Sequence, residues 1–340
     1  MKLNTKLLNT DDGINYLNSG LMVISAIMAF FIPFHLFLFV YAVLGPLHYL
    51  TEISWLEKRN FFILKKQDIL VFGALCLILF LSFFIPSMGN YNTALIMLSV
   101  VFAIFALLIK NNLAKYVMTI IAFFLLARYF PDNKIAENNN FNTVILFGIL
   151  LPTLIHVYVF TALFITTGAL KQNKFSGYFS LIVLLFCTSS FAWLLPEFST
   201  SVSGELRQVF DQFKWMNRAL LYLLGQGGFE NAKDVWTIPD SVIYTHPSGI
   251  ACMRFIAFAY TYHYLNWFSK TSVIKWHEVS KKRMFTILGL WILSVTLYAV
   301  NYKIGFYALF FLSMLHVMCE FPLNIISIQS IGTSIRSLVK

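Results

Sequence analysis

The stretch Gly20–Leu56, GLMVISAIMAFFIPFHLFLFVYAVLGPLHYLTEISWL, decides the fold, because it is apolar throughout and contains no polar loop. A helix needs about 20 apolar residues to cross a bilayer, so this stretch is long enough for two spans. Its only early break is Pro33. Because proline lacks a backbone N–H and disfavours helix for the residue before it, we expect one helix to end and the next to begin at Ile32–Pro33.

The rest of the chain has a similar composition. Hydrophobic residues occupy 59% of the 340 positions, charged residues occupy only 12%, and phenylalanine alone occurs 36 times. An average soluble domain is nearer half apolar and about a quarter charged. These values exclude a soluble globule, a disordered chain, a collagen and a disulfide-stapled scaffold. The sequence therefore predicts an all-α protein, a polytopic helical bundle integral to a membrane.

The apolar runs divide the chain into about ten predicted transmembrane helices within a single transmembrane domain, residues 1–340. We place these spans at about 14–32, 33–56, 68–87, 92–110, 115–131, 142–169, 177–195, 248–269, 284–301 and 304–326. The four cysteines, Cys76, Cys187, Cys252 and Cys319, all lie within these runs and form no C-x-x-C motif. We interpret them as small buried hydrophobic residues.

A long polar segment, 196–247, separates the seventh predicted span from the eighth. Within it Leu206, Val209 and Phe213 recur at helical spacing, which predicts an amphipathic helix over 204–224. We expect this helix to lie on the outer membrane surface, within an extracytoplasmic loop. The alternative interpretation is a lid over a pocket.

The net charge of +10 is spread over short basic clusters between the apolar runs. With a cytoplasmic N-terminus and ten spans, 17 Lys and Arg residues fall inside and 7 fall outside. This is the positive-inside pattern, which sets orientation. We therefore expect both termini in the cytoplasm and a location in a bacterial inner (plasma) membrane. No basic stripe follows a polar helix, so nucleic acid is not an expected partner.

Two acidic residues lie deep within the predicted spans, and each follows a histidine by four positions. The motifs are His48-Tyr-Leu-Thr-Glu52 and His316-Val-Met-Cys-Glu320. On a helix, residues i and i+4 share a face, so each pair can point a nitrogen and a carboxylate at one spot. Charged residues are costly inside a bilayer, and helix-borne metal ligands have this spacing.

Two more histidines, His156 and His263, fall within predicted spans on the cytoplasmic side of the midplane. His277, in the following cytoplasmic loop, is placed where it could fold back toward them. We predict a metal site formed by His48, Glu52, His156, His263, His316, Glu320 and His277. Imidazole and carboxylate ligands suit iron, zinc or manganese. The alternative is structural: hydrogen bonds between helices, and ion pairs that only make burial tolerable.

The predicted span 248–269 carries two candidate catalytic residues, Arg254 and Tyr260. Arg254 lies well inside the span, where it can pair with a substrate anion or extend its guanidinium toward the membrane surface. Tyr260 can support a metal ligand through a hydrogen bond, or it can belong to the inner aromatic belt of the membrane.

The general plan, many spans with a histidine site on the cytoplasmic side, resembles that of membrane-bound di-iron desaturases and hydroxylases. Their H-x-x-x-H and H-x-x-H-H motifs are absent from this sequence, so no family is assigned. We expect an enzyme that oxidises or hydroxylates a lipid or another apolar small molecule with one or two iron ions. Zinc for hydrolysis and heme held by two histidines are alternative cofactors. The competing interpretations are a proton-coupled transporter or channel, and a structural subunit with membrane-protein partners.

Overall fold

The computed structural model describes residues 10–130, 141–193, 202–225, 235, 238–270 and 274–339. Parts of three predicted segments lie outside these residues: the last positions of the spans 115–131 and 177–195, and residues 196–201, 226–234 and 236–237 of the outer loop. Within the described ranges all regular structure is helical and no strand occurs, which confirms the predicted all-α class.

Helices make up most of the described chain. In chain order they are α2 (Asp11–Phe31), α3 (Pro33–Glu57), η1 (Asn60–Phe62), η2 (Lys66–Asp68), α4 (Ile69–Leu81), α5 (Pro86–Gly89), α6 (Asn92–Leu108), α7 (Asn112–Tyr129), α8 (Phe141–Val144), η4 (Ile145–Phe160), α9 (Thr161–Gln172), α10 (Phe175–Trp193), α11 (Gly204–Phe210), η5 (Asp211–Phe213), α12 (Lys214–Leu223), α13 (Asp240–Thr245), α14 (Pro247–Ser269), α16 (Lys281–Val300) and α17 (Tyr302–Val339).

Seven helical segments of the described chain are long and apolar enough to cross a membrane. They are Asp11–Phe31, Pro33–Glu57, Asn112–Tyr129, Asn142–Gln172, Phe175–Trp193, Lys281–Val300 and Tyr302–Ser337. The other three predicted spans coincide with α4, α6 and α14. Of these, α4 has 13 residues and α6 has 17, while α14 has 23 residues but is rich in polar side chains. The protein is thus compatible with a membrane, and the predicted count of ten spans is not established.

The boundary predicted at Ile32–Pro33 is confirmed. Helix α2 ends at Phe31, Ile32 leaves the helical region with φ −132° and ψ 50°, and Pro33 opens α3. The first position of a helix suits proline, since its missing N–H would have no partner there.

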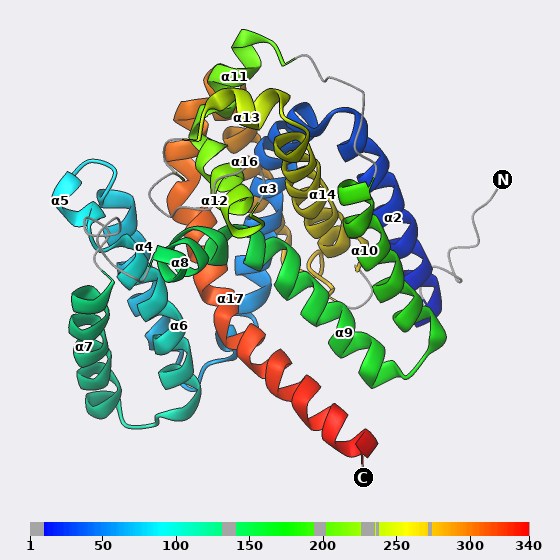
Figure 1. Cartoon of the computed structure of the whole chain (residues 1–340). Coiled ribbons are helices and arrows are strands. Elements are labelled where there is room, and N and C mark those ends of the chain that lie inside the picture. The colour runs from blue at the N-terminus through cyan, green and yellow to red at the C-terminus, as the bar shows by residue number, and fades with distance from the viewer. Residues whose placement is uncertain are drawn as a thin grey trace.

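Two helices, α3 and α14, form the centre of the bundle (Figure 1). They pack against each other, and α2, α16 and α17 pack around them. In the apolar stretch of α3, 67% of the residues are buried, whereas the share of buried residues is only 11% in α7 and 17% in α16. In a membrane, exposed apolar faces such as those of α7 and α16 would contact lipid, so the polar chemistry concentrates on the central helices.

The segment predicted as one amphipathic helix over 204–224 consists of α11, η5 and α12, three consecutive helical pieces. Its aromatic residues reach into the bundle. The Phe210 ring packs 5.1 Å from that of Phe34, and the Phe213 ring packs 4.9 Å from that of Phe37. The segment therefore packs against α3, α14 and η4, with α11 near the top of Figure 1 and α12 below it.

A buried ion pair joins η2 to α7. Asp68 and Lys115 form this pair with both side chains fully buried, and the Tyr116 hydroxyl donates to the second Asp68 oxygen at 2.9 Å. Removing one partner of such a pair leaves an uncompensated charge, which is far more costly than removing both. The contact between Lys66 and Glu57 is by contrast exposed.

We predict that Lys115→Met lowers the stability of the purified protein by about 3–5 kcal/mol, because it leaves the Asp68 carboxylate buried without a cation. The double variant Asp68→Asn/Lys115→Met should recover most of this loss. Lys66→Met, which removes an exposed pair, should cost at most about 1 kcal/mol. Thermal unfolding in detergent measures all three. Equal losses for Lys115→Met and Lys66→Met would contradict a structural role for the buried pair.

Candidate metal centre

The structure brings together six of the seven predicted ligands at the point where α3, η4, α14 and α17 meet. They are His48, Glu52, His156, His263, His316 and Glu320, and none is more than 6% exposed. We call these six side chains the His/Glu cluster.

Local structure explains why these side chains can meet. His48 and Glu52 share one face of α3, and His316 and Glu320 share one face of α17. His156 lies on η4, which is wound as a π-helix and contains Pro152. Short π-helical turns within α-helices are frequent at functional sites. His263 lies in the last two turns of α14, against α3.

The four imidazoles form a closed ring in which each contacts two others. Ring centroids are 4.6 Å apart for His48 and His263, and 5.1 Å apart for His263 and His156. The ring closes with 5.0 Å between His156 and His316 and 5.5 Å between His316 and His48. Four imidazoles from four helices thus surround one point.

The nitrogen atoms of this ring approach one another at distances typical of ligands on a shared ion. The Nε2 atoms of His48 and His263 are 3.0 Å apart, and those of His156 and His316 are 3.2 Å apart. The Oε2 atom of Glu52 is 3.0 Å from the His48 Nε2. Ligands held at about 2.1 Å from a metal lie about 3.0–3.4 Å from each other at octahedral to tetrahedral angles. The arrangement can therefore hold a metal ion.

Two of the imidazoles are held from their far side by another side chain. The Thr161 hydroxyl lies 2.8 Å from the Nδ1 of His263, and the Glu320 carboxylate lies 2.9 Å from the Nδ1 of His156. The Asn324 amide donates in turn to Glu320 at 3.4 Å. Partners at one ring nitrogen fix the tautomer and direct the other nitrogen inward, as is usual around metal-binding histidines. Glu320 contacts the outer side of an imidazole rather than its Nε2.

His48 is fixed by packing. The Trp267 ring lies 5.3 Å from the His48 ring, and its indole N–H donates to the Thr51 hydroxyl at 3.0 Å. Thr51 donates back to the His48 carbonyl at 2.9 Å. This chain of contacts ties α3 to α14 beside the His/Glu cluster.

The other predicted site residues lie elsewhere. His277 is exposed and packs against Trp276, at a ring distance of 5.7 Å. In the described chain two groups have ligand atoms close enough to share an ion, His48/His156/His263 and His48/Glu52/His316, and His277 belongs to neither. Arg254 is fully buried and lies 3.9 Å above the Phe30 ring. It precedes His263 by nine positions, which is about 13 Å along a helix. Tyr260 lines the cavity described next, and its hydroxyl contacts the Met216 sulfur at 3.8 Å.

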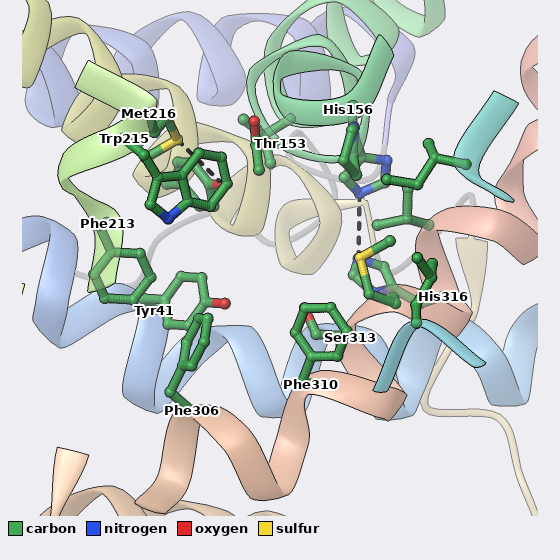
Figure 2. Close-up of a pocket in the computed structure, with 18 of the residues that line it drawn as sticks. Tyr41, Thr153, His156, Phe213, Trp215, Met216, Phe306, Phe310, Ser313 and His316 are labelled. Carbon is green, nitrogen blue, oxygen red and sulfur yellow. Dashed lines mark hydrogen bonds between the residues drawn. The ribbon is translucent and has the colours of Figure 1, made fainter. Parts of the chain in front are cut away.

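An elongated cavity of about 200 Å³ adjoins the His/Glu cluster and is lined by His156, His263 and His316. Figure 2 shows His156 and His316 at one side of this cavity and Phe213 and Trp215 at the other. Tyr41, Phe306 and Phe310 form much of the wall between them. A cavity walled by aromatic rings, with a few polar groups at one end, suits an apolar small molecule. We call it the aromatic cavity.

The charges of the His/Glu cluster are unusual for an apolar bundle. The ion-pair partners of Glu52 and Glu320 in the described chain are the histidines His48 and His156. Buried carboxylates need compensation by a cation or a proton. A divalent ion surrounded by the imidazoles would offset both carboxylates at once.

Several contributing residues were not predicted. Asn324 follows Glu320 by four positions, so helical spacing could have indicated it. Thr161 and the cavity residues Phe213, Trp215 and Met216 carry no such signal, because they meet the cluster or its cavity only through tertiary packing. No family model, curated protein or solved structure matches the chain in the comparisons made with each, so the site rests on its own geometry.

We predict that Thr161→Val destabilises the protein by about 1–3 kcal/mol, because a buried ring nitrogen of His263 loses its partner. Thr167→Val is the matched control on the same helix, since its hydroxyl bonds only to the Leu163 carbonyl of its own helix. Thermal unfolding in detergent compares the two. A loss for Thr167→Val as large as that for Thr161→Val would argue against a role of Thr161 in positioning His263.

Proposed function

We propose that the protein is a metal-dependent integral membrane enzyme, an iron-dependent oxidase or hydroxylase of a lipid or another apolar small molecule. The observation that supports this proposal is the inward convergence of four imidazoles from four helices, with one carboxylate beside them. Two groups that share His48 would hold one or two ions: His48 with His156 and His263, and His48 with Glu52 and His316. Glu320 and Thr161 would orient two of the imidazoles.

The donor types favour iron. His48, Glu52 and His316 combine two imidazoles with one carboxylate, the set that non-heme iron oxygenases use, with positions left open for a small reactant. A catalytic zinc ion also takes three such ligands, so zinc hydrolysis is the alternative. Contacts between neighbouring rings also disfavour heme, because axial histidines lie on opposite faces of a planar macrocycle.

The aromatic cavity suggests the substrate class. It is lined by three of the imidazoles, so a bound molecule would lie against the ion. Its walls offer aromatic surface with few polar groups, which favours a lipid or a similar apolar molecule. We place the protein in a bacterial inner (plasma) membrane with both termini in the cytoplasm, on the basis of the Lys and Arg distribution.

A transporter or channel is the second candidate. Cavities adjoin the His/Glu cluster on more than one side, and buried histidine and carboxylate chains relay protons in pumps. A third candidate is a structural subunit of a membrane complex, with the α11–α12 segment as its docking surface for a membrane-protein partner. The cluster would then matter only for stability.

We predict that purified wild-type protein contains about one to two equivalents of iron, and that His316→Ala retains less than a fifth of it. His35→Ala is the matched control, because this histidine is exposed on the same helix as His48. Elemental analysis and the absorption spectrum measure metal content and detect heme. Less than a tenth of an equivalent of any transition metal in wild-type protein would overturn the proposal.

We predict that Glu52→Gln lowers the iron content at least several-fold, because it replaces a negatively charged ligand by a neutral amide. If the cluster instead relays protons, the same variant should keep its fold and abolish pH-driven flux in proteoliposomes. Flux in wild-type vesicles that is lost in Glu52→Gln would favour the transporter.

A further inference from the structure

A second cavity, of about 240 Å³, adjoins the His/Glu cluster and is distinct from the aromatic cavity. Both carboxylates of the cluster line it, together with His48 and His263. Its remaining wall includes the polar side chains of Asn266 and Lys270. The cluster therefore lies between two cavities: the second is lined by both carboxylates and a lysine as well as by apolar side chains such as Trp55 and Leu323, and His263 lines both.

A third cavity, of about 160 Å³, adjoins the second one on the side of the bundle end where α3, α9 and α14 terminate and α2 begins (Figure 1). Asn266, Lys270 and Phe164 line both cavities. The third cavity adds the polar residues Asp11, Asn15, Asn18, Gln172 and Ser180 to its wall. A row of amide, hydroxyl and charged side chains thus leads from this end of the bundle to the cluster.

Helix α14 displays the row most clearly. His263, Asn266 and Lys270 stand at positions i, i+3 and i+7, so they share one face of the helix. The same helix carries the buried apolar residues Ile256, Ala257 and Phe258 further toward its start. Polar side chains at membrane depth almost always face the bundle interior or a water-filled cavity.

We propose that these two adjoining cavities, with Asn18, Asn266 and Lys270 among their lining residues, open to each other and form an entrance through which water and small polar co-reactants reach the His/Glu cluster. The apolar substrate would occupy the aromatic cavity on the other side. The use of this entrance rests on the proposed metal centre, whereas its existence does not. A reaction at the cluster that takes up or releases protons requires such a connection to water.

The competing explanation is that the same amides only hold helices together. The Asn15 amide donates to Gln172 at 3.1 Å, and the Ser269 hydroxyl donates to Asn18 at 3.0 Å. In that case no solute would pass between them. Accessibility to a charged reagent distinguishes the two explanations.

The test measures the reaction of introduced cysteines with a small sulfonated methanethiosulfonate, followed by mass spectrometry of the intact, full-length protein in detergent. Asn266→Cys probes the second cavity and Asn18→Cys probes the third. The matched controls are Ala259→Cys on α14 and Ser25→Cys on α2, which are 2% and 0% exposed and line neither cavity. The four native cysteines are at most 4% exposed, so their reaction sets the background.

We expect Asn266→Cys and Asn18→Cys each to react at least tenfold faster than the control on the same helix. Metal-free and metal-loaded protein should both show this difference, so a failure of the proposed metal centre would not produce a failure here. If either variant reacts only as fast as its control, while its unfolding temperature shows that it is folded, the route is not continuous and the proposal is wrong.

Discussion

The arrangement of the bundle depends on the need to compensate two carboxylates and four imidazoles buried among apolar helices. Each of these groups would be costly to bury alone. They are tolerable together because every one has a close polar neighbour, from 2.8 Å between Thr161 and His263 to 3.2 Å between His156 and His316. This requirement brings α3, η4, α14 and α17 to one point, and the remaining helices cover them.

The same requirement explains the uneven distribution of polarity in the bundle. Helices α3 and α14 carry most of the polar side chains near the cluster and are buried, while α7 and α16 keep their apolar faces exposed. The α11–α12 segment contributes aromatic residues, Phe213 and Trp215, to the wall of the aromatic cavity. The cavity lined by the imidazoles and the proposed entrance on the other side of the cluster would suit two reactants of unlike chemistry.

Much of the cluster could be predicted from sequence because its signal is local. The pairs His48/Glu52 and His316/Glu320 are four residues apart, and helix geometry places such residues on one face regardless of the rest of the fold. Hydropathy likewise placed His156 and His263 within apolar runs. His277 had no such local support: it lies in a connection, and the structure leaves it exposed. Arg254 was selected as a candidate catalytic residue only because it lies inside an apolar span. Such a position does not indicate which group the guanidinium contacts.

The sequence by itself determined the all-helical class, the boundary at Ile32–Pro33, the presence of helices long and apolar enough to cross a membrane, and the i,i+4 His/Glu pairs. These follow from composition, proline stereochemistry and helical periodicity, all of which act over a few residues. Only the tertiary structure decided that the four imidazoles form one ring and that Glu320 contacts His156 from its outer side. It also decided that Phe213 lines the aromatic cavity and packs against Phe37, which lies more than 100 residues away along the chain. Those outcomes depend on how helices pack against one another, because the distance between side chains on different helices is set by crossing geometry and not by spacing along the chain.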